Sequence, residues 1–274
     1  MEATKKAVII APFIYTDSTE EFLANGLREV GWEVLCQKTQ YLREAPDGDT
    51  RLTLVVKQCP LPAEQLPGKK VLYLLDNLIR KPELAFEACK AYDHVMLAHR
   101  DKIEDEDSRF YFLPVGYDPR THFWTGFNPP KTTDVCFIGT CHPSREWIKR
   151  IPGIEIYGNS WDAVRYPIYN IEKREQVYRT KINVNQHFPH DTVNMRQFEI
   201  AAIHGFLLTD QAWPFEEFVE VALYRNEQDF KAQVAYYLED ENEREVIAEN
   251  GYKAVRKHTY AERMREMLSV VGCK

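Results

Sequence analysis

Short apolar runs separated by amphipathic segments repeat along the first half of the chain. The runs are of strand length and rich in Val, Ile, Leu and aromatic residues, which is typical of strands buried in a parallel sheet. A capping-box pattern at residues 18–21 predicts a helix that ends at Gly31, and a second helical pattern runs from Pro82 to Tyr92. This alternation predicts an α/β fold with a doubly wound parallel sheet. The predicted strands are Ala7–Phe13, Trp32–Gln37, Arg51–Val56, Val71–Leu75, His94–Ala98 and Phe110–Leu113.

The alternation begins again after a stretch crowded with proline and glycine, which we interpret as a linker at residues 119–133. We therefore expect two Rossmann-like βαβ domains that face a cleft, at residues 1–118 and 134–258. A C-terminal helix at residues 259–274 can pack back on the first domain. In the second half, strands are predicted at Val135–Gly139, Ile154–Tyr157, Ile182–Asn185, Phe206–Thr209 and Ala222–Tyr224, and helices through Trp147 and Arg150, from Ile171 to Thr180, and at Glu227–Leu238, Glu243–Lys257 and Tyr260–Val271.

The stretch NMRQFEIAAIHGFLLTD, at residues 194–210, combines a helix with a buried strand. Thr192 or Asp191 can cap the helix by accepting a backbone N–H, and Gly205 is expected to end it. Apolar residues recur three to four positions apart between these limits, as one buried helix face requires.

Arg196 and Glu199 stand one turn apart on a neighbouring stripe of this helix. A charged pair at a helix start beside a buried strand fits a nucleotide site. On this local pattern alone, an exposed ion pair that contributes only about 0.2–0.5 kcal/mol is the preferred interpretation.

Composition narrows the class of protein. Apolar residues make up 44% and charged residues 28% of the 274 residues, as in folded globular proteins, and the net charge of −7 argues against a broad basic surface for nucleic acid. The six cysteines form no CxxC pair, so neither a disulfide framework nor a structural metal is indicated. There is no GxGxxG dinucleotide motif. The start MEATKK leads to no signal-peptide pattern, and the longest apolar runs are strand-sized, so we predict a cytoplasmic protein without a membrane span.

Several motifs in order carry a resemblance to a known family. The passage LPVGYDPRTHF followed by VCFIGT resembles the junction between the two halves of GT-B glycosyltransferases. FIGT, IYG, KINVN, NMRQFEIAA with GFLLTD, and HTYAERM resemble, in this order, the C-terminal domain of CgeB-like (spore-protein type) glycosyltransferases. The resemblance covers the second half well, whereas the first half matches only as a Rossmann-like layout. It implies a GT-B fold whose second domain holds a nucleoside-diphosphate sugar.

The related retaining glycosyltransferases carry Glu, seven residues and a second Glu. Glu199 falls at the second position, where the resemblance implies a ligand for the ribose hydroxyls, because a carboxylate can accept two hydrogen bonds from a vicinal diol. Asp191 falls at the first position, which would approach the donor sugar, although it is one methylene shorter and can equally be a helix cap.

A diphosphate leaving group needs cations, because charge develops on it as the sugar–phosphate bond breaks. The resemblance implies Arg145 for this role, with Arg196 and Lys181 as further candidates and Asn194 beside them. Tyr157 and Gly158, at a strand end, would meet the base, or would only end the strand. These residues complete the expected donor site.

In the first domain, Asp76 ends the strand VLYLLD, where the related enzymes often place a histidine. It could orient the acceptor hydroxyl or act as a base, or it could cap a turn. His99 ends the next strand and is expected to point to the cleft, either as a catalytic residue or only as part of its polar lining. GT-B enzymes do not generally need a metal, so the resemblance implies metal-independent transfer with no cofactor besides the donor.

The expected function is the transfer of a sugar, a hexose or a pentose, from a nucleoside-diphosphate sugar to an acceptor hydroxyl with retention. The acceptor is open: a glycan, a small molecule, a protein or modified DNA. One alternative is a non-catalytic protein that binds nucleotide sugars or glycans and kept only the fold. A further alternative is a phage-type enzyme that glycosylates a modified DNA base.

Overall fold

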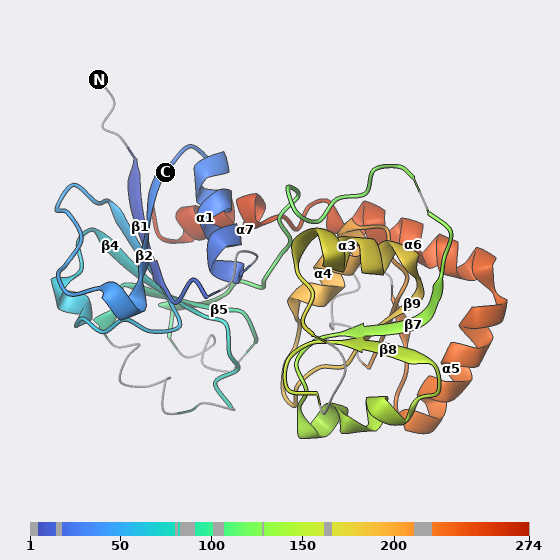
Figure 1. The fold of residues 1–274 in the computed structure, drawn as a ribbon. Coiled ribbons are helices and arrows are strands. Elements are labelled where there is room, and N and C mark those ends of the chain that lie inside the picture. The colour runs from blue at the N-terminus through green and yellow to red at the C-terminus, as the bar shows by residue number, and fades with distance from the viewer. Residues whose placement is uncertain are drawn as a thin grey trace. The chain divides into compact units, whose positions relative to one another are not determined.

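A computed structural model describes residues 5–14, 18–79, 82, 91–100, 107–127, 129–161, 166–210 and 221–273. The chain divides into two compact units (Figure 1). Unit 1 comprises Met1–Asp118 together with Thr259–Lys274, and unit 2 comprises Pro119–His258. The expected linker at residues 119–133 therefore belongs to unit 2, and its last residue, Thr133, is the first residue of the next strand. Most of the helix expected at Pro82–Tyr92 lies outside the described residues.

Unit 1 contains a six-stranded sheet in the order β2-β1-β3-β4-β5-β6, and all neighbouring strands are parallel. Its buried strands supply most of the apolar core, as their continuous apolar runs predict. The strands are β1 (Lys6–Ala11), β2 (Glu33–Lys38), β3 (Leu52–Val56), β4 (Lys69–Leu74), β5 (His94–Leu97) and β6 (Phe110–Phe112), and short 3-10 helices lie at Thr39–Tyr41 and Ala63–Gln65.

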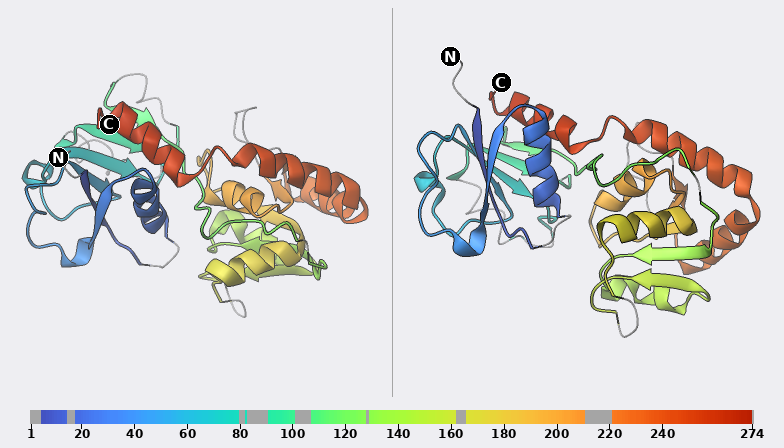
Figure 2. Two further views of the ribbon diagram at one scale, coloured as in Figure 1. Left: turned by 90° about the horizontal axis from the view of Figure 1, so that it is seen from above. Right: turned by 45° about the horizontal axis from the view of Figure 1, so that its top comes forward.

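The C-terminal helix α7 (Tyr260–Val270) belongs to unit 1, where it packs on α1 (Thr19–Glu29) (Figures 1 and 2). The two helices approach closely because Gly26 has no side chain: a Cβ there would overlap the backbone of Tyr260. Tyr117 also pairs with Thr259 in an isolated parallel bridge, so the chain leaves unit 1 and returns to it at adjacent points.

Unit 2 contains a five-stranded parallel sheet in the order β11-β10-β9-β7-β8. Helices α3 and α4 pack on one face and η5, α5 and α6 contribute to the core on the other, so unit 2 is a three-layer α/β structure. Its elements are β7 (Thr133–Ile138), η5 (Pro143–Arg150, a 3-10 helix), β8 (Ile154–Tyr157), α3 (Asn170–Arg179), β9 (Thr180–Asn185), α4 (Met195–Ala202), β10 (Leu207–Thr209), β11 (Ala222–Leu223), α5 (Glu227–Glu239) and α6 (Glu241–Val255).

The ends of α4 differ from the prediction. Asn194, not Thr192 or Asp191, is the N-cap, and its side chain accepts a hydrogen bond from the backbone N–H of Arg196. At the other end His204 takes the left-handed conformation (φ 61°) that Gly205 was expected to supply. Gly205 instead provides space, since a Cβ there would overlap the side chain of Ile200.

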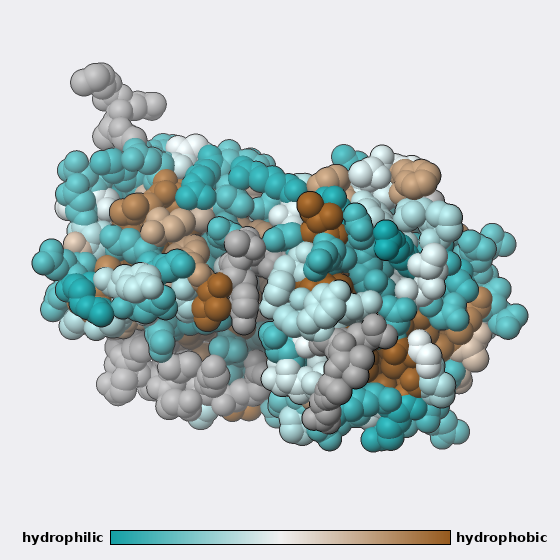
Figure 3. Space-filling view, viewed as in Figure 1, coloured by the Kyte–Doolittle hydropathy of each residue, from teal (hydrophilic) through white to brown (hydrophobic). Residues whose placement is uncertain are grey.

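Both sheets reverse their strand order between the first and third strands of the unit, that is, between β1 and β3 and between β7 and β9. In open α/β sheets, ligands bind outside the carboxyl ends of the strands at such a switch point. The β7/β9 edge is therefore where unit 2 is expected to bind a ligand. No helix in the described part of the chain is long and apolar enough to cross a membrane, and the face in Figure 3 is mostly hydrophilic, with separate small hydrophobic patches.

Candidate functional site

Arg196 spans the switch point of unit 2. Its Nε donates to the carbonyl of Ile138 at the end of β7, and its Nη1 donates to Oδ1 of Asn185 at the end of β9, at 3.2 Å. A Cβ on Gly139, the glycine of the FIGT motif, would overlap Nη2 of Arg196. Glycine at this position therefore allows the guanidinium to lie across the two strand ends.

A second guanidinium lies beside the first. Arg145, on η5, is 1% exposed; its Nε and Nη2 donate to the carbonyl of Gln186 at 2.9 and 2.6 Å, and its Nη1 donates to the carbonyl of Thr140 at 3.0 Å. The ring of Phe188 lies 3.8 Å from the guanidinium carbon. Burial, and then the charge of Arg196, lower the pKa of Arg145 to about 9, so the side chain is still a cation at neutral pH.

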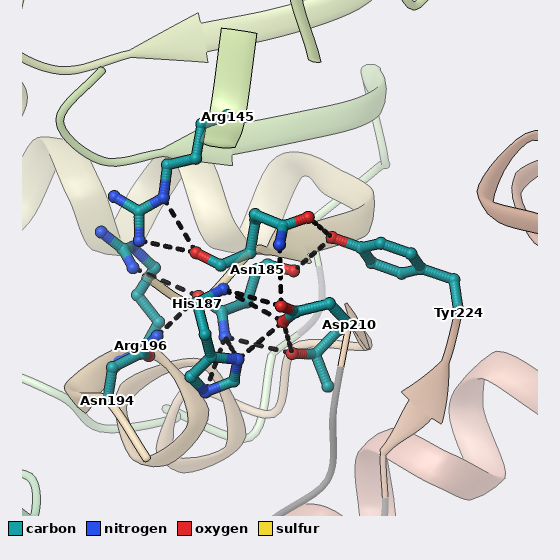
Figure 4. Close-up of polar contacts among 9 residues, drawn as sticks. Arg145, Asn185, His187, Asn194, Arg196, Asp210 and Tyr224 are labelled. Atoms are coloured by element: carbon teal, nitrogen blue, oxygen red, sulfur yellow. Dashed lines mark hydrogen bonds and ion pairs between the residues drawn. The ribbon is translucent and has the colours of Figure 1, made fainter. Parts of the chain in front are cut away.

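Asn185 connects Arg196 to the rest of the site (Figure 4). Its Oδ1 accepts from Nδ2 of Asn194 at 2.9 Å as well as from Arg196, and its own Nδ2 donates to Oγ1 of Thr209 at 3.1 Å. The end of β9, the end of β10 and the first turn of α4 are thus joined through one buried amide.

Asp210 fixes the chain that follows β9. Its carboxylate accepts the backbone N–H of His187 at 3.0 and 3.1 Å, Nε2 of Gln186 at 2.8 Å, and Nδ1 of His187 at 2.6 Å. The hydroxyl oxygen of Tyr224 lies 2.9 Å from both the carbonyl of Asn185 and Oε1 of Gln186, so its one proton is shared between the two acceptors. Burial, followed by the charge of Asp210, raises the pKa of Tyr224, so this hydroxyl remains protonated. The loop that carries the Arg145 contacts is therefore held at several points.

Asp191 is 7% exposed and lies in the loop between β9 and α4. Its charge raises the pKa of Arg145 and of Arg196 against the opposing effect of burial. It therefore belongs to the same charged cluster, and its approach to a donor sugar stays a prediction.

Glu199 lies in a buried ion cluster. Its side chain is 2% exposed; Oε2 is 2.8 Å from Nζ of Lys173 on α3, and Oε1 is 3.3 Å from Nε2 of His122. Burial alone would raise the pKa of Glu199, but Lys173 and His122 outweigh it and lower the pKa below 4.5. The carboxylate expected to bind ribose is thus already occupied by two side chains of its own unit.

His122 is part of a segment near the start of unit 2, residues 122–124, that packs on the helices of this unit. The next residue, Phe123, lies under the guanidinium of Arg174 at 4.2 Å, and its carbonyl accepts the hydroxyl of Tyr178. Trp124 stacks on His204, with ring centroids 4.0 Å apart. Residues 122–124, within the segment interpreted as a linker, therefore pack on α3, on α4 and on the residue that follows α4.

We expect Trp124→Ala to lower the free energy of unfolding by about 2 kcal/mol, because the change removes the stack on His204 and the edge contact with Tyr252. Urea unfolding measures the difference. Phe127→Ala is the control in the same segment: Phe127 is 66% exposed, so its loss should change stability by less than about 0.5 kcal/mol. Equal effects of the two changes would contradict packing of this segment.

The other residues expected at the donor site differ in where they lie relative to the arginines. Lys181 is the second residue of β9, at the amino-terminal edge of the sheet, where it pairs with Asp134 at 2.6 Å. Tyr157 ends β8 and donates its hydroxyl to Glu155 at 2.8 Å. Gly158 packs so closely on Gly139 that a Cβ would overlap its carbonyl.

Unit 1 places Asp76 and His99 just beyond the carboxyl ends of the adjacent strands β4 and β5. His99 is 7% exposed, and its Nε2 lies 3.2 Å from the carbonyl of Leu75. Their roles toward an acceptor stay predictions.

No motif assigned a role to Asn185, His187 or Asp210. A signal was nonetheless present, because Asn185 and Asp210 directly follow apolar strand runs and so had to lie at the carboxyl edge of the sheet. No comparable signal exists for His122 and Lys173, whose partner Glu199 lies far away in the sequence.

Residues 142–269 match the glycosyl transferase-like family. The matched range is slightly less than half of the chain and includes Arg145, Asn185, Arg196 and Asp210. No curated protein matches the chain.

Solved structures show the fold over nearly the whole chain. A glycosyltransferase from Rickettsia africae superposes with a TM-score of 0.63 at 10% identity, covering 98% of each chain. HepE from Anabaena, in complex with UDP and glucose, has a TM-score of 0.66 at 10% identity and covers 97% of this chain and 99% of its own. An alpha1,3-fucosyltransferase with GDP-fucose has a TM-score of 0.56 at 10% identity, covering 99% and 92%. The chain has the GT-B fold, with one Rossmann-like sheet in each unit.

Proposed function

We propose that this protein transfers a sugar from a nucleoside-diphosphate sugar to an acceptor hydroxyl. The observation that carries the proposal is the position of Arg196, which bridges the ends of β7 and β9 at the switch point of unit 2 with the cationic Arg145 beside it. The family match over this region supports the reaction class. UDP-glucose in HepE and GDP-fucose in the fucosyltransferase are donors of the expected kind in proteins of the same fold.

In this proposal the two guanidinium groups bind the diphosphate, together with the N-terminus of α4, whose backbone N–H groups face the same edge. As the sugar–phosphate bond breaks, negative charge develops on the leaving diphosphate, and the fixed cations stabilise it. Because Arg145 and Arg196 supply this charge, we propose that transfer does not require a metal ion. Chelation with EDTA should then leave the rate unchanged.

Three finer points belong to the same proposal. Transfer with retention rests on the position of Asp191 eight residues before Glu199, as in the retaining relatives of the CgeB-like enzymes. Binding of ribose by Glu199 requires the donor to compete with both of its partners, His122, which is 2% exposed, and Lys173, whose side chain is 16% exposed. Asp76 and His99, at one edge of unit 1, are the candidates to orient or deprotonate the acceptor.

The experiment is a panel of UDP-, GDP-, TDP- and ADP-sugars with the purified protein. Thermal shift and calorimetry report binding, released nucleoside diphosphate reports turnover, and proton NMR of the product reports the anomeric configuration. Multiple turnovers with one donor would support the proposed transferase activity. A product whose anomeric configuration is opposite to that of the donor would exclude transfer with retention. Binding of a donor without turnover would favour a non-catalytic binding protein, and no binding of any nucleoside diphosphate would overturn the proposal.

DNA carrying a modified base is an arm of the same experiment. If it is the acceptor, the protein should retain such DNA at low salt and release it as the salt concentration rises. Transfer to this DNA and to no glycan would identify the acceptor class.

A further inference from the structure

Asn185 is a buried, neutral hydrogen-bond hub beneath the two arginines. It is 0% exposed and is the last residue of β9, where its partner in the neighbouring strand β10 is Thr209. The Nδ2 group donates to Oγ1 of Thr209, so Oδ1 must face Asn194 and Arg196. The amide can take only this orientation, because the reverse would direct its N–H groups at two further donors.

The orientation is supported from β10. The hydroxyl of Thr209 donates to Oδ1 of Asp210 at 3.3 Å, which leaves its lone pairs toward Asn185. The Asp210 carboxylate is in turn fixed by the backbone and ring of His187. A chain of hydrogen bonds therefore runs from Asp210 through Thr209 and Asn185 to Arg196; Figure 4 shows Asp210, Asn185 and Arg196 in place.

The neutral charge of the Asn185 amide matters as well as its position. An amide oxygen accepts from a guanidinium without neutralising it, whereas a carboxylate at the same place would form an ion pair with Arg196. The other acceptor of Arg196 at the strand ends, the carbonyl of Ile138, is also neutral. The charges of Glu199, Asp191 and Asp210 also act on Arg196, but the two acceptors that orient its guanidinium at the strand ends are neutral.

We propose that Asn185 is a positioning residue that holds Arg196 across the β7 and β9 ends while leaving its charge available for the diphosphate of the donor. The inference rests on the proposed function for the identity of that ligand. In this proposal Asn185 contacts Arg196 and not the substrate. Replacing Asn185 should therefore weaken binding of the diphosphate part of the donor and not binding of the nucleoside part.

The test compares Asn185→Asp with Asn226→Asp. Both changes add one negative charge to unit 2 and conserve side-chain size; Asn226 is the exposed N-cap of α5, a position where Asp also caps. With the nucleoside diphosphate that the wild-type protein binds best, Asn185→Asp should raise Kd about tenfold or more, since the new carboxylate neutralises Arg196. Affinity for the matching nucleoside, which lacks phosphate, should change less than about twofold, and Asn226→Asp should change both by less than about twofold.

A role of Asn185 in folding alone would weaken nucleoside and nucleoside diphosphate equally, and this outcome, or an unchanged Kd for the diphosphate, would overturn the inference. A second measurement does not depend on the ligand. In NMR of ¹⁵N-arginine protein, Asn185→Ala should make the Nη1 hydrogens of Arg196 exchange with water about tenfold faster and leave those of Arg145 unchanged, because Nη1 of Arg196 donates to Asn185 whereas Nη1 of Arg145 donates to the carbonyl of Thr140.

Asn185→Asp should keep the slow Arg196 signal, because it keeps the acceptor. If Asn185→Ala leaves the Arg196 signal unchanged, positioning is refuted whatever the ligand. If the wild-type protein binds no nucleoside diphosphate but the Arg196 signal responds as expected, the proposed function fails and the positioning of Arg196 stands.

Discussion

Replacing Arg196 with alanine is expected to weaken binding of the donor's nucleoside diphosphate and to lower kcat/KM for transfer, each by about 100-fold. The guanidinium is the group that bridges the ends of β7 and β9 through Ile138 and Asn185, so its loss removes a fixed cation from the switch point. Calorimetry with the nucleoside diphosphate and initial rates with the sugar donor measure the two effects. Arg196→Lys should recover part of the loss, because an ammonium keeps the charge but cannot span both acceptors.

The matched control is Arg179→Ala. Arg179 also belongs to unit 2 and lies in an exposed ion pair with Glu175, so its replacement removes the same charge away from the site. It should change donor affinity less than about twofold. An Arg196→Ala protein that binds the nucleoside diphosphate as tightly as the wild type would refute a diphosphate site at this edge of the sheet.

Lys173→Met should destabilise the folded protein by about 3 kcal/mol. The change leaves the Glu199 carboxylate, 2% exposed, with His122 as its remaining ion-pair partner, and removing one partner of a buried pair strands the other charge. Urea unfolding with a double-mutant cycle provides the measurement. Lys173→Met combined with Glu199→Gln should cost less than the sum of the single changes, since the double variant has no stranded charge. Additive effects would show that the two side chains do not interact.

The same pair predicts a dependence of stability on pH. Because the pKa of Glu199 is lowered in the folded state, the unfolded chain binds the proton more tightly, and the stabilisation is present above the ordinary pKa of 4.5 and lost as the pH falls through the folded-state value. Between pH 7 and pH 4 the wild-type protein should therefore lose more free energy of unfolding than Glu199→Gln. The opposite order would mean that burial, which raises the pKa, outweighs the two cations.

The strand runs and helices were largely predictable, because burial of apolar residues at period 2 or 3.6 is a local property of the chain. The prediction was wrong at both ends of α4, where several residues could have ended or capped the helix. His204, not Gly205, supplies the left-handed residue after α4, and Asn194 caps the helix in place of Thr192 or Asp191. Several capping residues lie close together here, and only the path of the loop after β9 selects among them.

Strand direction decides which site residues meet. Arg145, Arg196 and Asn194 come together because each lies at the start of the helix that follows the carboxyl end of a strand in unit 2, whereas Lys181 is the second residue of β9 and lies at the opposite edge. The placement of Lys181 follows from its position before the apolar run of β9 and was open to prediction. Asn185, at the end of the same run, could have been selected by the same argument.

By itself, the sequence determined the alternation of strands and helices, the two parallel sheets, and the positions of polar residues relative to the strand ends, since short-range sterics and apolar burial set these features. The tertiary structure decided the partners. It paired Glu199 with His122 and Lys173, and it placed a neutral amide, Asn185, under Arg196. Contacts between residues far apart in the chain depend on how strands are ordered and helices packed over them, and no local pattern encodes that order.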